Sequence, residues 1–224
     1  MKEIYCVKSI NEVHQMLGLG APKHPLITII RKWPKIDFDF EKITAAAHTV
    51  GAKAGFDCAH AAGNLAMKLH DWQVDFAVWC SYKYLNSGPG GTSGVFVHEN
   101  HGNNPNLHRF AGWWGNDEKT RFTMPDVFVP QAGAAGWQLS NAQVLPMAAH
   151  KASLEIFDEA GIQNLRAKSK KLTSFLAFLI EQINERKGRT VFDIITPNNI
   201  QERGCQLSIL TEEATGRPIF DWIT

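Results

Sequence analysis

Two short blocks of the sequence combine residue types that can carry out covalent chemistry. FDCAHAAGN, residues 56 to 64, places Asp57 at the end of an apolar run, with His60 shortly after it. SYKYLNSGPGG, residues 81 to 91, places Lys83 between two tyrosines, after a second apolar run and before a cluster of glycines. A lysine amine can form a Schiff base with an aldehyde, and a carboxylate can keep a pyridine nitrogen protonated by pairing with it. These are two demands of pyridoxal-phosphate chemistry.

Each of these residues also has an ordinary structural explanation. Asp57 on its own suits a cap for the following segment as well as a cofactor ligand, and an isolated lysine is usually a surface residue. The position of Lys83 after an apolar strand and between Tyr82 and Tyr84 favours a catalytic role. His60 either contacts the cofactor or is a buried histidine with satisfied partners, and we favour the cofactor contact.

The glycines that follow Lys83 allow two interpretations. Residues 87 to 93 form either a phosphate cradle, because glycine lets backbone amides approach an anion, or a simple turn that passes close to a neighbouring backbone. No GxxxxGK pattern is present, so the turn is at least as well supported as the cradle.

The surrounding elements predict how the two blocks are positioned. Residues 40 to 49 have apolar positions at helical spacing, and residues 51 to 57 follow as a buried strand. Residues 74 to 80 form a second β-rich run, and another short strand starts near residue 93. Strands that alternate with helices predict an α/β layer with a parallel-rich sheet, in which Asp57 and Lys83 face one crevice at the carboxyl ends of adjacent strands.

The pattern changes after Met147. A long segment rich in helix formers is interrupted once, at Gly161, and predicts two helices. RTVFDIITP and RGCQLSIL then predict two strands of a small α+β domain. We therefore expect an unrelated or fused segment over residues 1–36, part of a large cofactor-binding domain over 37–147, and linking helices with part of a small carboxyl-terminal domain over 148–224.

Composition excludes several classes of function. The 224 residues carry 23 basic and 22 acidic side chains without a basic cluster, which argues against a nucleic-acid partner. The four cysteines lack C-x-x-C spacing, so we expect reduced core thiols and no metal site. No signal stretch or membrane-length apolar run is present, and we expect a cytoplasmic protein with a small-molecule substrate and no membrane partner.

From about residue 37 to residue 224, the sequence closely resembles the kynureninases, pyridoxal-phosphate enzymes of tryptophan catabolism in the fold-type-I, class-V aminotransferase group. The resemblance rests on several blocks that follow one another in order. They are GFDCAHAAGN, LHDWQVDFAVWCSYKYLNSGPGG, GWWG at 112 to 115, LSN at 139 to 141, ASLEIF at 152 to 157 and ERGCQLSIL at 202 to 210.

The resemblance implies hydrolysis of L-kynurenine, or its 3-hydroxy form, to an anthranilate and L-alanine, in a pathway that leads to NAD. It implies that Lys83 is the catalytic residue and holds the cofactor. The other implied cofactor-binding residues are Asp57, His60, Tyr82, Trp113 and Asn141. Trp113 and Asn141 would come from the partner subunit of a homodimer, although taken alone they read as a core aromatic and a turn residue.

Several alternatives to a complete kynureninase stay open. A class-V desulfurase or aminotransferase usually has a histidine before the lysine, where this sequence has Tyr82, which favours kynureninase. Residues 1–36 resemble the opening of AraC-type regulators, and family members are longer, with a substrate-binding arginine beyond the matched region. We therefore also expect a truncated or fused reading frame with little hydrolysis of its own. Three hypotheses for the chain stay open: a working kynureninase completed by another chain, a non-catalytic remnant that binds cofactor weakly or not at all, and a regulator fragment. The lack of a basic helix-turn-helix disfavours the regulator fragment.

Overall fold

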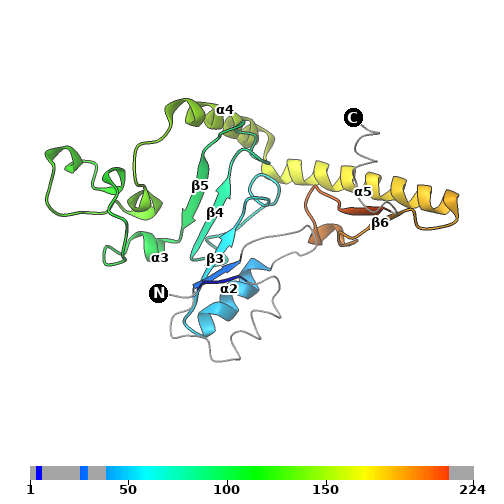
Figure 1. Ribbon diagram of the computed structural model, residues 1–224, viewed down its shortest axis with the longest axis horizontal. Helices are drawn as coiled ribbons and strands as arrows, with labels where there is room; N and C mark the ends of the chain where they lie inside the picture. The colour runs from blue at the N-terminus through cyan, green and yellow to red at the C-terminus, as the bar shows by residue number, and fades with distance from the viewer. Residues whose placement is uncertain (1–3, 7–25, 30–38, 212–224) are drawn as a thin grey trace. The chain divides into compact units, whose positions relative to one another are not determined.

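The computed structural model describes residues 4–6, 26–29 and 39–211, and they include a five-stranded sheet (Figure 1). Its strands are β1 (Ile4–Cys6), β2 (Leu26–Ile29), β3 (Lys53–Asp57), β4 (Phe76–Cys80) and β5 (Ser93–Val97), and they lie in that order. The first four are parallel and β5 pairs with β4 in the antiparallel direction. The α/β class with a parallel-rich sheet is therefore confirmed.

The register between β3 and β4 depends on a glycine. Gly55 pairs with Phe76, and a Cβ atom on Gly55 would lie 2.0 Å from the Phe76 ring. Glycine therefore leaves room for the aromatic side chain to cross the neighbouring strand. The same register sets Asp57 opposite Val78 at the carboxyl end of the pair.

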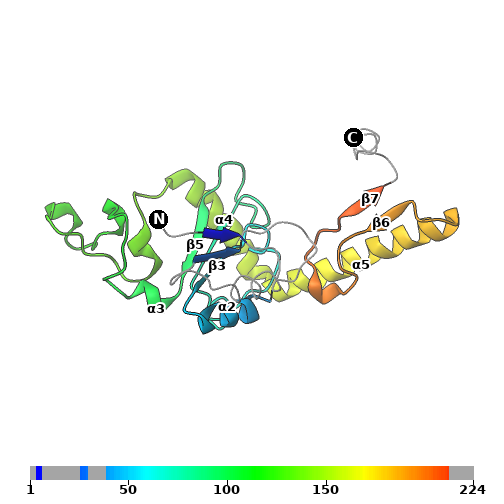
Figure 2. The same cartoon turned by 60° about the horizontal axis from the view of Figure 1, so that its bottom comes forward.

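Helix α2 (Phe40–Thr49) covers one face of this sheet (Figures 1 and 2). Its first turn is capped by Asp39, whose carboxylate accepts a hydrogen bond from the backbone N–H of Lys42 at 2.9 Å. Phe40 stacks on Phe56 of β3 with ring centroids 4.2 Å apart. The core beneath consists of Ile43, Ala47, Ala52, Ala54, Phe56, Cys58, Val74 and Ala77.

The connection from β3 to β4 contains turns and no helix, whereas the sequence had suggested strands that alternate with helices. Gly63 and Gln73 in this connection have φ values of 80° and 56°, which interrupt a regular helix. Beyond β5 the chain forms the short helix α3 (Glu99–Gly102). A long segment follows that contains the 3₁₀ turns η1 (Trp113–Gly115), η2 (Arg121–Thr123) and η3 (Gly133–Trp137) and an isolated antiparallel β-bridge between Asn116 and Pro130.

Two helices follow, α4 (Val144–Ala160) and α5 (Ile162–Lys187), as the sequence predicted. Gly161 separates them with φ of 73°, a left-handed value that favours glycine. Strands β6 (Phe192–Ile194) and β7 (Ile209–Thr211) form an antiparallel pair, and the turn η4 (Ile200–Glu202) lies between them in sequence. Arg166 of α5 donates to the carbonyl of Ile200 at 3.1 Å, which attaches this turn to the helix.

The chain divides into two compact units. The first contains Met1–Arg31, Phe38–Gly63 and Met67–Glu159, and the second contains Lys32–Asp37, Asn64–Ala66 and Ala160–Thr224. This differs from the expected boundaries at residues 36 and 147. Strands β1 and β2 fall within the segment expected to be separate, yet they continue the same parallel sheet.

The cysteine side chains differ in their environments. Cys58 is buried and Cys80 is half-buried, but Cys205 is exposed, so the expectation that all four are core thiols is wrong at Cys205. The side chain of Cys6 lies outside the described residues. Within the described part of the chain, no helix is long and apolar enough to cross a membrane.

Candidate functional site

The structure brings Asp57 and Lys83 to the same edge of the sheet. Asp57 is the last residue of β3, and Lys83 lies three residues beyond the end of the adjacent parallel strand β4. The backbone N–H of Cys58 donates to the carbonyl of Val78 at 2.7 Å, which continues the pairing of the two strands past Asp57. The two principal side chains of the predicted site therefore lie on neighbouring strand ends.

His60 completes this arrangement. Its Nε2 atom lies 3.2 Å from the Nζ atom of Lys83, within hydrogen-bonding distance. The His60 ring also meets the Tyr84 ring edge-to-face, with centroids 6.0 Å apart. Tyr82 is exposed on the other side of the lysine in sequence, and its ring centroid is 5.8 Å from Nζ. The amine of Lys83 thus lies near one imidazole and one phenol ring.

A close backbone contact fixes the His60 loop against the Lys83 loop. A Cβ atom on Gly63 would lie 2.8 Å from the carbonyl carbon and oxygen of Tyr84. Gly63 also has a left-handed φ of 80°, so any other residue there is strained as well as crowded. Gly63 therefore permits the close approach that places His60 beside Lys83.

Asp57 serves as a cap and keeps an oxygen for another contact. Its Oδ1 atom accepts a hydrogen bond from the N–H of Ala59 at 2.8 Å, which stabilises the turn after β3. No hydrogen bond to Oδ2 is seen within the described residues.

Burial, together with the nearby charge of Asp57, raises the pKa of the Cys58 thiol to about 12. Cys58 is therefore a neutral core residue at ordinary pH.

The glycine-rich loop after Lys83 forms a turn. Gly88 and Gly90 have φ values of 83° and 73°, and the N–H of Gly91 donates to the carbonyl of Gly88 at 3.0 Å. This geometry supports the turn interpretation, because the amide of Gly91 is used within the loop itself.

Trp113 and Asn141 belong to two segments of the first unit that contact each other. The backbone N–H of Trp114 donates to the carbonyl of Leu139 at 3.5 Å, which joins their two segments. Both residues are exposed, so Trp113 is not a core aromatic. In the described part of the chain, neither has a hydrogen bond or ring contact with Asp57, His60 or Lys83.

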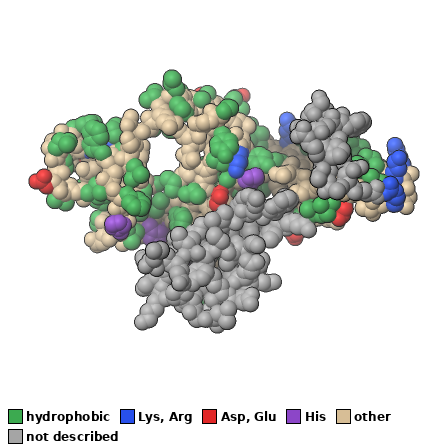
Figure 3. Space-filling model, viewed as in Figure 1, with side chains coloured by type: hydrophobic (Ala, Val, Ile, Leu, Met, Phe, Trp, Pro, Cys, Tyr) green, Lys and Arg blue, Asp and Glu red, His purple; other side chains and the backbone are tan. Residues whose placement is uncertain are grey.

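The segment that carries Trp113 exposes many apolar side chains. Figure 3 shows hydrophobic side chains on this part of the molecule, at the left of the view. They include Phe110, Phe122, Met124, Val127 and Val129. The indole N–H of Trp113 donates to the carbonyl of Arg121 at 3.2 Å, so the ring is held by its own segment.

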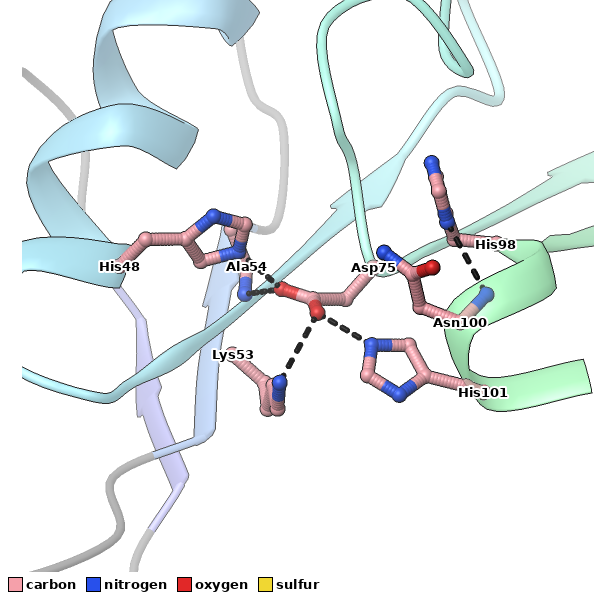
Figure 4. Close-up of polar contacts among 7 residues, drawn as sticks. All are labelled: His48, Lys53, Ala54, Asp75, His98, Asn100 and His101. Atoms are coloured by element: carbon pink, nitrogen blue, oxygen red, sulfur yellow. Dashed lines mark hydrogen bonds and ion pairs between the residues drawn. The ribbon is translucent and has the colours of Figure 1, made fainter. Parts of the chain in front are cut away.

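Sequence reasoning missed a buried carboxylate at the opposite end of β4. Asp75 accepts hydrogen bonds from Ala54 N–H at 2.7 Å, His48 Nε2 at 2.9 Å and His101 Nε2 at 2.5 Å, and Lys53 Nζ lies 3.5 Å away (Figure 4). These partners come from α2, β3 and α3. Burial alone would raise the pKa of Asp75, but these hydrogen bonds and the charge of Lys53 lower it below its usual value. The feature of the sequence that could have revealed this carboxylate is an acidic residue, Asp75, within the apolar run of residues 74 to 80.

The donor set at the first edge defines the ligand that it fits. A primary amine, a carboxylate with an oxygen to spare and an imidazole suit a ring that has both an aldehyde and a basic nitrogen. No group of three or more metal-binding side chains occurs among the described residues. The arrangement is therefore suited to covalent attachment through Lys83 and to charge pairing through Asp57.

Comparison with protein families agrees with this chemistry. Residues 36–209 match the family model described as aminotransferase class-V. The chain is 53% identical over 186 residues to the kynureninase of Flavobacterium johnsoniae, a match that covers 83% of this chain and 43% of that protein. It is 58% identical over 172 residues to the kynureninase of Koribacter versatilis, covering 77% of this chain and 40% of the relative.

A third relative extends further along the chain. The kynureninase of Stenotrophomonas maltophilia is 45% identical over 221 residues, covering 95% of this chain and 50% of that protein. About 11 residues remain outside this match, so most of residues 1–36 fall within it. The resemblance of residues 1–36 to AraC-type regulators lies largely outside the described residues and stays a prediction. The chain spans between two-fifths and half of the length of these relatives.

Solved structures share the fold at low sequence identity. A cysteine desulfurase from Thermococcus onnurineus NA1 has a TM-score of 0.66 at 14% identity, covering 95% of this chain and 50% of that chain. An alanine–glyoxylate aminotransferase from Nostoc sp. has a TM-score of 0.58 at 14% identity, covering 97% of this chain and 53% of that chain. These likenesses concern the fold alone and confirm the fold-type-I class expected from the sequence.

Proposed function

The chain belongs to the class-V aminotransferase family, and we propose that it carries the lysine-bearing part of a kynureninase. The proposed reaction is hydrolysis of L-kynurenine or 3-hydroxy-L-kynurenine to anthranilate or 3-hydroxyanthranilate and L-alanine. The observation that supports this choice within the family is the 45 to 58% identity to kynureninases from three bacteria. Tyr82, which precedes the lysine, supports it as well.

Pyridoxal 5'-phosphate is the cofactor that fits the side chains at the β3 and β4 ends. Bound there, it would supply an electron sink that stabilises negative charge on the substrate carbon next to the amino group. Lys83 would hold it covalently through the amine. Asp57 would pair with the ring nitrogen through its carboxylate, which has acceptor capacity left after the hydrogen bond from the N–H of Ala59.

Lys83 and His60 would handle the proton of the substrate. With substrate bound, the free amine of Lys83 would be a base that can take the proton from the α-carbon. The 3.2 Å contact with His60 Nε2 restricts where that amine points. His60 would thereby orient the base toward one face of the substrate, which contributes to rate through positioning.

The remaining residues of the proposed site are Tyr82, Trp113 and Asn141. The exposed Tyr82 hydroxyl would donate to the cofactor phosphate. Trp113 and Asn141 would reach the site of a partner subunit, because both are exposed, their two segments contact each other, and neither has a described contact with Lys83 in its own chain. The protein would then be a homodimer, and we propose that it acts in the cytoplasm.

A chimeric enzyme tests the proposed function, since this chain spans less than half of the Flavobacterium johnsoniae relative. Residues 36–209 replace the aligned part of that kynureninase, and a second chimera contains Lys83→Ala. Each purified protein is supplied with pyridoxal phosphate and offered L-kynurenine, L-cysteine, or L-alanine with glyoxylate. The readouts are anthranilate fluorescence, sulfide release and glycine formation.

We expect anthranilate from the first chimera and at least a thousandfold less from the Lys83→Ala chimera, because covalent catalysis needs the amine. Sulfide or glycine as the main product would instead favour a desulfurase or an aminotransferase. A folded chimera without any of the three products would favour a non-catalytic remnant, and either result would overturn the proposal.

A further inference from the structure

We propose that the buried hydroxyls of Ser81 and Ser87 form a clasp that positions Lys83 for its reaction with the cofactor. Both serines would be positioning residues, since neither is expected to touch the cofactor or the substrate. The proposal rests on the proposed function, because it assigns Lys83 the covalent role. The clasp would explain why the amine of Lys83 is held in one position.

The clasp consists of contacts at the base of the loop that carries Lys83. Ser81 follows the end of β4 and is fully buried, and Ser87 is 4% exposed. Their Oγ atoms lie 2.8 Å apart. The Ser81 hydroxyl also donates to the carbonyl of Thr92, the residue before β5, and the Ser81 N–H donates to the same carbonyl at 3.2 Å.

The donors of this network can be assigned from its chemistry. A carbonyl oxygen only accepts, so the single proton of the Ser81 hydroxyl points to Thr92. The proton of Ser87 must then point to the Oγ atom of Ser81. The chain of donation therefore runs from Ser87 through Ser81 to Thr92, and both hydroxyls are satisfied without water.

This network closes a short loop around Lys83. The N–H of Ser87 donates to the carbonyl of Ser81 at 3.1 Å, and the N–H of Asn86 donates to the carbonyl of Lys83 at 3.1 Å. The Lys83 backbone therefore lies inside a ring of hydrogen bonds that begins and ends at the two serines. Its side chain extends from this fixed base to Nε2 of His60.

Two further contacts hold the other side of the same loop. The Ser153 hydroxyl of α4 donates to the carbonyl of Leu85, and the backbone of Tyr84 lies against Gly63. These contacts fix residues 84 and 85 but do not reach residue 81 or 87. Loss of the clasp would therefore leave the side of the loop between β4 and Lys83 held by backbone hydrogen bonds alone.

Two variants of the full chain remove the clasp in different ways. Ser87→Ala deletes the hydroxyl. Gly91→Ala displaces it, because a Cβ atom at Gly91 would lie 2.0 Å from the Ser87 Oγ atom. Ser93→Ala removes an exposed hydroxyl from β5 as a matched control. Ile43→Val weakens the core of the same unit without touching the loop, which controls for lost stability.

Two measurements follow on each protein. Hydrogen exchange of the peptide containing residues 81 to 92 is measured without cofactor. Labelling by pyridoxal phosphate and cyanoborohydride is then followed by mass spectrometry, as the rate at Lys83 relative to the exposed Lys119. We expect faster exchange and about a tenfold fall in this ratio for Ser87→Ala and Gly91→Ala, the size expected for one hydrogen bond. Both controls should keep the wild-type ratio.

The two proposals fail in different ways. If the wild-type chain labels Lys83 no faster than Lys119, the proposed function is contradicted, and hydrogen exchange still tests the clasp. If labelling is selective but Ser87→Ala and Gly91→Ala keep the wild-type ratio, the serines only stabilise the fold and the positioning role is wrong. An equal fall in the labelling ratio of Ile43→Val would also overturn the positioning role. Unchanged hydrogen exchange would show that the clasp does not hold the loop.

Discussion

The Nζ atom of Lys83 lies 3.2 Å from the Nε2 atom of His60, although 23 positions separate the two residues in sequence. The contact exists because β3 and β4 are adjacent parallel strands and because Gly63 lets the two following loops approach closely. The imidazole is therefore a fixed neighbour of the amine on which the proposed chemistry depends.

We predict that His60→Ala slows covalent attachment of pyridoxal phosphate to Lys83 about tenfold, because a lost hydrogen bond of this kind is worth about 1.5 kcal/mol. The rate is measured from the visible absorbance of the adduct after mixing. His70→Ala is the control, since His70 lies on the exposed connection between β3 and β4. Equal rates in all three proteins would show that His60 does not orient the amine.

Asp57→Asn should weaken cofactor binding much more than it weakens the fold. Asparagine keeps an oxygen that can accept from the N–H of Ala59, so we expect a loss of at most about 1 kcal/mol in unfolding free energy. The charge that pairs with the ring nitrogen is lost. Urea unfolding and equilibrium titration with pyridoxal phosphate measure the two effects. If Asp57→Asn is strongly destabilised but binds the cofactor with unchanged affinity, Asp57 acts only as a cap.

Asp75→Ala should destabilise the first unit by about 3 kcal/mol, because it removes the buried carboxylate that accepts from the buried N–H of Ala54 and from the imidazoles of His48 and His101. Urea unfolding followed by circular dichroism measures the change. Asp71→Ala removes a carboxylate that is 67% exposed, and it should change the stability by no more than about 0.5 kcal/mol. Similar losses in both variants would contradict the buried network.

The stabilisation from Asp75 should disappear in acid. Its pKa in the folded chain is lowered below 3.8, because the hydrogen bonds from His48, Ala54 and His101 outweigh the effect of burial. A depressed pKa stabilises the fold above the unfolded value, near 4, and this contribution is lost as the pH falls through the folded value.

We therefore expect the difference in urea midpoint between wild type and Asp75→Asn to be largest above about pH 5 and to shrink steadily below pH 4. The exposed Asp71→Asn variant serves as the control, and its difference from wild type should be small throughout. A difference between wild type and Asp75→Asn that grows toward acid pH would mean that the sign is wrong.

Much of the strand and helix pattern followed from the sequence, because it depends on local periodicity. The run ending at Asp57, the run ending at Cys80 and the break at Gly161 all appear at or near the expected positions. The placement of Asp57 and Lys83 at one edge followed too, since adjacent parallel strands end on the same side of a sheet.

Other features depend on contacts between distant residues and could not be read from one sequence. Asp75 accepts hydrogen bonds from His48 and His101, which lie on two different helices, and nothing in the local spacing of the sequence relates these three positions. The pairing of Ser81 with Ser87 depends on how the loop turns back on itself. Strands β1 and β2 are short, and the prolines around them suggested a separate segment instead of a continued sheet.

The most direct measurement identifies the lysine that holds the cofactor. The full chain is incubated with pyridoxal phosphate, reduced with borohydride, digested and mapped by mass spectrometry, beside a Lys83→Ala chain treated in the same way. The account predicts one dominant modified peptide that contains Lys83, and loss of both this peptide and the visible absorbance band in Lys83→Ala. Modification centred on another lysine, or an equal yield from the Lys83→Ala chain, would contradict it.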